Sequence, residues 1–102
     1  DLPACTAWAE LAFSEYPNNQ SVRFALALCY LMNNDALSAQ ALLISDLQKA
    51  PPICPTQRLI GALTLHRNKS LDLSKKWAPR EYFSLLTDAE RRLLKEVIIQ
   101  AK

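Results

Sequence analysis

The side chains best suited to binding a metal or to catalysis are few in this chain. His66 is the single histidine, and it stands among basic residues with no second metal-ligating residue close to it in sequence. Cys5, Cys29 and Cys54 are widely separated and form no CxxC motif, whereas zinc sites use about four ligands at characteristic spacings. We therefore expect no metal site, and we expect His66 to lie in a turn or groove.

The three cysteines cannot all pair with one another, and each lies at or beside an apolar position. This pattern favours reduced thiols in the core of a cytoplasmic protein. The alternative is a redox or metal-binding role. The chain offers no paired motif to support that role.

Catalytic motifs of the common kinds are also missing from the sequence. Gly61 is the only glycine, so no Gly-rich phosphate loop can form, and the serines do not stand in a strand–turn–helix nucleophile motif. Asp46 is the one acidic residue whose position is unusual, for the reason given below. We expect a protein that is not an enzyme and that carries no cofactor.

Charge is unevenly distributed along the chain. Residues 1–57 carry five acids and two bases, whereas residues 58–102 carry ten bases and five acids. A nucleic-acid site would combine the basic residues with neighbouring aromatic side chains: Arg58, Arg67, Lys69, Lys75, Lys76, Arg80, Trp77, Tyr82 and Phe83. The bases alternate with acids, and the aromatic residues fall where a helical core needs them. We therefore predict solvated helix faces and no nucleic-acid partner.

Length and composition indicate a single helical domain over residues 1–102. The longest apolar run, Phe24 to Met32, has nine residues and is far shorter than the roughly 20 that span a bilayer. We therefore expect a soluble protein. One glycine, little strand-like alternation and prolines at helix boundaries predict an all-α fold. The first residue is Asp1 and not methionine, which suggests a piece of a longer chain.

Helical periodicity locates the first three helices. Residues 4–16 form an apolar pattern that stops at Pro17, and residues 20–32 and 36–49 follow, the last ending before Pro51. Ser21 and Asp35 are the expected N-caps of the second and third helices. The first helix has no preceding helix to cover it, which indicates an upstream segment or a bound protein.

Pro51 follows Pro17 by 34 residues, and this spacing is typical of a helix–turn–helix repeat. Residues 5–65 resemble tetratricopeptide (TPR) repeats. With Gln20 as position 1 of a unit, the residues that fit the family pattern are Leu26, Ala27, Tyr30, Ala39, Leu43 and Pro51. Asp46 replaces a small packed residue. It is expected either to face solvent or to pair with a base from a neighbouring unit.

The resemblance divides the chain into four parts. Residues 4–17 match the second helix of an incomplete repeat, residues 20–51 a full repeat, and residues 54–86 a degenerate repeat. In the degenerate repeat Gly61 falls where helices approach most closely, residues 66–70 form the turn, residues 71–77 a short helix, and Pro79 begins another. Residues 87–101 open with the capping box Thr87-Asp88-Ala89-Glu90 and are expected to cap a right-handed solenoid of antiparallel helix pairs.

In TPR arrays the first helix of each unit lines a concave groove. Carried onto this chain, the resemblance implies the partner-binding residues Ser21, Phe24, Leu28, Leu31, Met32, Arg58, Ala62, Leu65 and His66. Such an apolar groove would suit an amphipathic helix of a protein partner. The alternative is that the C-terminal helix, or an upstream one, covers the groove.

These features predict a non-enzymatic protein-interaction module or adaptor. In size, repeat number and apolar groove the chain also resembles the small cytoplasmic chaperones of bacterial type III secretion. A third interpretation is a structural repeat segment of a larger regulatory protein. The exposed first helix is in addition a candidate surface for homo-oligomerisation.

Overall fold

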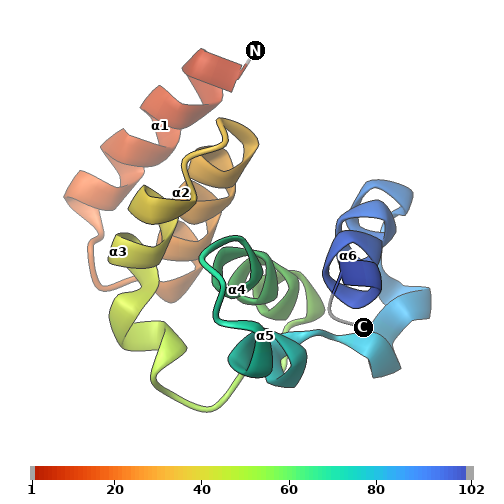
Figure 1. Cartoon of the computed structure of the whole chain (residues 1–102). Coiled ribbons are helices and arrows are strands. Elements are labelled where there is room, and N and C mark those ends of the chain that lie inside the picture. Colours follow the sequence, from red (N-terminus) through yellow and green to blue (C-terminus); the bar gives the residue numbers. More distant parts are fainter. Residues whose placement is uncertain (1, 101–102) are drawn as a thin grey trace.

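The computed structural model describes residues 2–100, and the side chains of all of these except residues 2, 82, 83, 99 and 100. The described chain is all-helical (Figure 1). Its elements are α1 (Leu2–Glu15), α2 (Gln20–Met32), α3 (Ala36–Leu47), α4 (Pro55–Arg67), α5 (Leu71–Trp77), the 3₁₀ helix η1 (Arg80–Leu85) and α6 (Asp88–Gln100). The predicted stacking groups Tyr82 and Phe83, and the last three residues of the predicted capping helix (99–101), lie outside the described side chains.

Local capping explains where the helices begin. The Asp35 carboxylate accepts a hydrogen bond from the Ser38 amide at 3.1 Å, which confirms the predicted cap of α3. The prediction for α2 is wrong, because Asn19 and not Ser21 caps this helix by accepting from the Val22 amide at 3.1 Å. Helix α4 instead begins with Pro55, whose ring lacks an amide hydrogen in need of a partner.

The turns that end α2 and α4 share one geometry. Asn34 and Lys69 both adopt left-handed backbone, with φ of 60° and 69°. After each of them the next amide donates back across the turn at 2.8 Å, from Asp35 to the Tyr30 carbonyl and from Ser70 to the Leu65 carbonyl. This is the hydrogen bond of a Schellman motif. The same helix ending therefore recurs along the chain.

Helix α4 lies at the centre of the packing. It contacts α2, α3, α5 and α6, whereas the main contacts of α1 are with α2 (Figure 1). Every residue from Leu59 to His66 is buried. The core around it is built from Phe24, Ala27, Leu31, Ala39, Leu43, Leu59, Ile60, Leu63, Trp77, Leu94 and Val97.

The only glycine permits the closest of these contacts, as predicted. A Cβ atom added to Gly61 would lie 2.6 Å from Cζ3 of Trp77, so the indole ring occupies the space that any other side chain would need. Trp77 in turn stacks on Phe24, with ring centroids 6.3 Å apart. Gly61 thus lets α5 close onto α4 while Trp77 reaches α2.

Several predicted boundaries needed correction. Helix α3 ends at Leu47 and not at Lys49, and His66 and Arg67 belong to the last turn of α4 and not to the turn after it. The segment after Pro79 is a 3₁₀ helix. Helix α5 runs over residues 71–77 as predicted.

The prediction of core thiols is also wrong. Cys5 and Cys54 are exposed, and Cys29 is only partly buried. Burial raises the pKa of the Cys29 thiol, and the nearby Cys5 raises it further, which favours the less reactive protonated form. Among the described residues no group of three or more histidine, cysteine or acidic side chains is placed to hold a metal ion. In the same part of the chain no helix is long and apolar enough to cross a membrane.

Candidate functional site

The residues predicted to line a concave groove are mostly in the core. Five of the nine are buried: Phe24, Leu31, Ala62, Leu65 and His66. The reason is tertiary packing, because α4 lies against α2 and α6 lies against α4. The expectation of an open apolar groove at these five positions is therefore corrected.

The other four predicted groove residues do not form one surface. Ser21 is exposed, Leu28 is partly buried against the core, and Met32 is 53% exposed. Arg58 is held at the end of α5, where Nη1 donates to Glu81 Oε1 at 2.7 Å and Nε donates to the Trp77 carbonyl at 3.3 Å. This arginine has a structural role at the α4–α5 contact.

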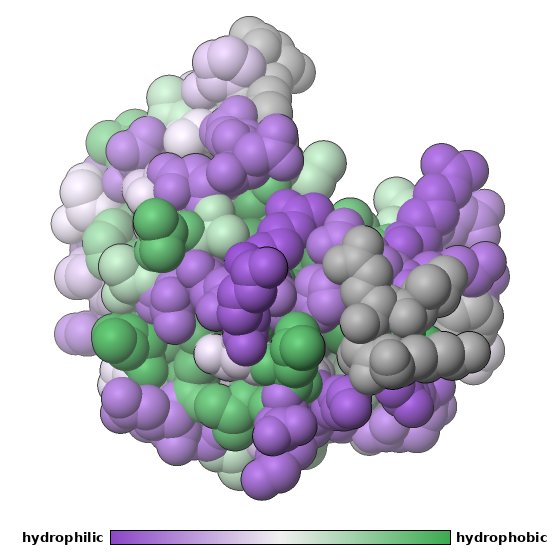
Figure 2. Space-filling model, in the orientation of Figure 1, coloured by the Kyte–Doolittle hydropathy of each residue, from purple (hydrophilic) through white to green (hydrophobic). Residues whose placement is uncertain are grey.

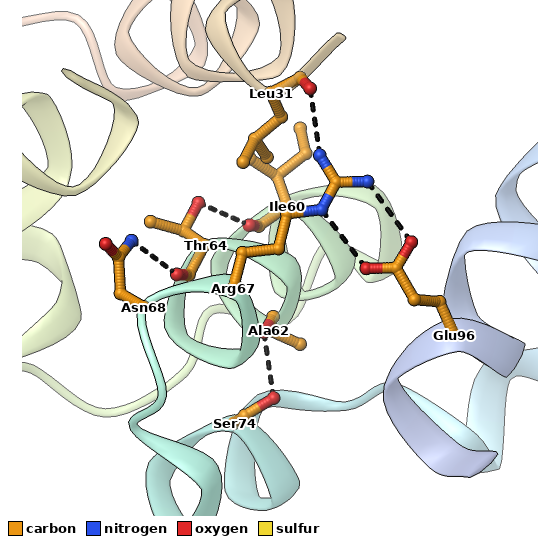
Figure 3. A network of polar contacts seen from close by, with 8 residues as sticks. All are labelled: Leu31, Ile60, Ala62, Thr64, Arg67, Asn68, Ser74 and Glu96. Carbon is orange, nitrogen blue, oxygen red and sulfur yellow. Dashed lines mark hydrogen bonds and ion pairs between the residues drawn. The ribbon is translucent and has the colours of Figure 1, made fainter. Parts of the chain in front are cut away.

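A hollow remains between the N-terminal helices and α6 (Figure 2). Arg67 joins its two sides, since Nη1 donates to the Leu31 carbonyl at 2.8 Å and the rest of the guanidinium faces Glu96 (Figure 3). The two bonds to the Glu96 carboxylate measure 3.1 and 3.2 Å. The adjoining cavity, about 340 Å³, is lined by His66, Arg67, Lys69, Leu71 and Glu96. Arg67 and Glu96 are already hydrogen-bonded to each other, and the cavity is lined mainly by polar side chains. It therefore suits an apolar helix poorly.

Asp46 is buried and paired. Its Oδ1 accepts from Arg23 Nη2 at 2.8 Å and its Oδ2 accepts from Nε at 2.9 Å. Arg23 belongs to the same helix pair and not to a neighbouring one, so neither predicted environment of Asp46 is found. The hydrogen bond to Asp46 raises the pKa of the guanidinium, against the opposing effect of burial. The pair joins α2 to α3 and offers no free carboxylate for catalysis.

The clearest apolar hollow lies between α3 and α5. We call it the α3–α5 groove and define it by two adjoining cavities of about 250 and 490 Å³ that share Leu47, Gln48 and Leu73. The other lining residues are Gln40, Ile44, Lys49, Ala50, Pro51, Leu65, Ser70, Lys76 and Trp77. Ile44 is 57% exposed and Leu73 is 44% exposed. Figure 2 shows apolar side chains gathered over α3 and α5.

The groove combines an apolar line on α3 with positive charge. Leu37 precedes Ile44 by two turns on α3 and is 74% exposed, so the apolar line continues beyond the cavities. Every charged residue that lines the groove is a cation, namely Lys49 and Lys76. The groove therefore matches an apolar surface with acidic residues at its edge.

A second apolar surface lies on α1, and we call it the α1 stripe. Ala4, Ala7, Trp8 and Leu11 line a shallow depression of about 290 Å³. Trp8 is 74% exposed and Leu11 is 51% exposed. Ala9, Ala12 and Phe13 are partly buried on the other side of the helix. Helix α1 thus has two apolar faces, of which one is open.

Sequence reasoning missed the α3–α5 groove. A signal was present, because α3 (ALSAQALLISDL) is apolar on more than one face: Leu43 and Leu47 enter the core while Leu37 and Ile44 do not. A helix that is apolar nearly all round is expected to have contacts on several sides.

Comparisons with models of protein families, with curated proteins and with solved structures find no match. What the protein does must therefore be inferred from its own surfaces.

Proposed function

We propose that this protein is a non-enzymatic protein-interaction module that binds an amphipathic helix of a partner in the α3–α5 groove. The observation that carries the proposal is the exposure of Ile44 and Leu73 on facing sides of an apolar hollow. A helix that presents side chains at i, i+3, i+4 and i+7 fits such a groove. This surface replaces the concave face predicted from the sequence.

We also propose that the helices form a short TPR-like right-handed solenoid capped by α6. Two observations support this arrangement. Each of α2 and α4 begins a helix pair, and α4 contacts both members of the pair before it, as stacked repeats do. In addition, α6 contacts both α4 and α5, which is the place that a further repeat would take.

The energetics of the groove suit moderate affinity. Each large apolar side chain that a partner buries there contributes about 1.5–3 kcal/mol, and association itself costs roughly 4–15 kcal/mol. Several anchors are therefore needed. Lys49 and Lys76 at the rim contribute orientation and association rate more than affinity, because exposed ion pairs are worth about 0–1 kcal/mol.

Peptide binding tests the proposal. The probe is a fluorescent designed helix with leucines at i, i+3, i+4 and i+7 and glutamates beside them, titrated by anisotropy against the full chain. We expect Leu73→Glu to weaken binding by at least about tenfold, since 1.4 kcal/mol is a factor of ten. The matched control is Met32→Glu, an equally polar change at an exposed apolar residue of the predicted concave face.

Each outcome has a definite meaning. Loss of binding in Leu73→Glu with retention in Met32→Glu supports the groove. The reverse result moves the binding surface to the exposed end of α2, where Met32 lies. Unchanged binding in both variants, or no binding to the unaltered chain, rejects the proposal. Circular dichroism of each variant checks that the fold is intact.

A further inference from the structure

The α1 stripe has the residue spacing that a groove-binding helix needs. Ala4, Ala7, Trp8 and Leu11 are spaced i, i+3, i+4 and i+7, so they lie along one line of α1. The two alanines allow close approach while Trp8 and Leu11 supply the large anchors. The remaining face of α1 packs on α2, and the stripe points away from that contact.

Charge on α1 complements charge at the α3–α5 groove. Over Leu2–Glu15 the charged residues are Glu10 and Glu15, and both are exposed. Glu15 follows Leu11 by four residues and so continues the line of the stripe, whereas Glu10 lies beside Ala7, three residues away. The groove presents Lys49 and Lys76 and no acid among its lining residues.

We propose that α1 of one copy of this chain docks in the α3–α5 groove of a second copy. The proposal rests on the proposed function, because it assigns a specific occupant to the same groove. Both surfaces are present on each copy. In Figure 1 α1 lies at the upper left and α5 at the bottom, so the two surfaces occupy different parts of the fold. The contact is therefore head-to-tail. Each added copy leaves one free stripe and one free groove, so the assembly grows into a closed ring or an open chain.

Charge disfavours the two symmetric alternatives. Pairing of α1 with α1 would bring the acids Glu10 and Glu15 of two copies together with no cation on either described helix. Pairing of groove with groove would bring Lys49 and Lys76 of two copies together. Like charges in direct opposition are unfavourable, whereas the head-to-tail arrangement alternates their signs.

Analytical ultracentrifugation of the full chain, over a range of protein concentrations and at low and high salt, tests this inference. We expect species larger than a dimer that grow with concentration and shrink with salt, because the rim charges are screened. Trp8→Glu blocks the stripe and Leu73→Glu blocks the groove, so each variant alone is expected to weaken association by at least about tenfold.

Mixing the two blocked variants gives the decisive result. Each retains the surface that the other lacks, so an equimolar mixture forms a one-to-one dimer and nothing larger. Leu85→Glu is the matched control, because Leu85 is an exposed apolar residue of η1 that belongs to neither surface. That variant is expected to associate like the unaltered chain.

Other outcomes overturn the inference in recognisable ways. Association that survives Leu73→Glu but not Trp8→Glu indicates α1 pairing with α1, and the opposite pattern indicates groove pairing with groove. A monomer at every concentration excludes a second copy as the occupant. The peptide titration above remains a separate test, so the groove can be retained as a binding site even if self-association fails.

Discussion

At the scale of single residues, the fit of Gly61 against Trp77 is the contact least tolerant of change. Gly61 lies in the middle of α4, where glycine costs about 1 kcal/mol of helix stability relative to alanine. Its presence there is explained by the indole of Trp77, which lies where a Cβ would be. Trp77 itself is 2% exposed and holds α4, α5 and Phe24 of α2 together.

We predict that Gly61→Ala destabilises the protein by about 1–3 kcal/mol, the usual cost of overpacking a core. Helix propensity alone predicts the opposite sign, a gain of about 1 kcal/mol. Urea unfolding followed by circular dichroism measures the difference. Gly61→Ala combined with Trp77→Leu should cost less than the sum of the two single changes, because the smaller side chain makes room for the methyl group. A stabilising Gly61→Ala would contradict the packing described here.

At the scale of elements, the start of α6 is held by a polar cluster that also reaches α4. The Thr87 amide donates to Glu90 Oε1 at 2.9 Å and the Glu90 amide donates to Thr87 Oγ1 at 3.2 Å, which confirms the predicted capping box. The Thr56 hydroxyl donates to Glu90 Oε2 at 2.6 Å. Because Thr56 lies in the first turn of α4, the glutamate joins the beginnings of two helices.

This cluster makes the docking of α6 sensitive to acid. Burial alone would raise the pKa of Glu90, but hydrogen bonds from Thr56 and Thr87 outweigh it and lower the pKa below its ordinary value of 4.5. A carboxylate with a lowered pKa in the folded state stabilises the fold at pH values above its unfolded pKa. That contribution is lost as the pH falls through the folded value.

We therefore predict that Glu90→Gln reduces stability at neutral pH by about 0.5–1.5 kcal/mol, because glutamine can still complete the capping box but accepts neutral and not charge-assisted hydrogen bonds. The difference between variant and unaltered chain should shrink below pH 4.5 as the native carboxylate becomes protonated. Thermal unfolding at a series of pH values measures it. Glu15→Gln is the matched control, because Glu15 is exposed at the end of α1 and outside this cluster. A difference that stays constant through acid would reject this role for Glu90.

The helices could be predicted from the sequence, whereas the candidate binding groove could not. The caps at Asp35 and Thr87 and the bounds of α5 follow from chemistry within a few residues, and these predictions are confirmed. Which face of a helix stays open depends on distant segments. Ala62 and Leu65 occupy groove positions in the repeat pattern, yet they are buried because α2, α3, α5 and α6 all pack against α4.

Leu73 illustrates the converse case. In the repeat pattern Leu73 stands where a small packed residue is usual, so the pattern predicts a contact between helices at this position and not a binding surface. In the structure Leu73 is 44% exposed beside Ile44, while Ser74 and Trp77 of the same helix are buried. Identifying the α3–α5 groove required the positions of both helices.

At the scale of the whole molecule, the helices differ in how many neighbouring helices they pack against. Helix α4 is enclosed by α2, α3, α5 and α6, and its residues from Leu59 to His66 are all buried. Helix α1 depends mainly on α2, and none of its described residues is fully buried. Segments with few buried contacts open by local fluctuation, whereas central ones open only when the whole domain unfolds.

Native-state hydrogen exchange on a dilute sample should therefore rank the helices, with α1 exchanging fastest and α4 slowest. We expect the opening free energy of α1 to be lower than that of α4 by at least about 1.4 kcal/mol, a tenfold difference in protection. Raising the protein concentration should slow exchange in α1 if that helix docks on a second copy, and Trp8→Glu should abolish the slowing. If α1 in the dilute sample is as protected as α4, then α1 is an integral part of the cooperative core and is not held mainly by α2.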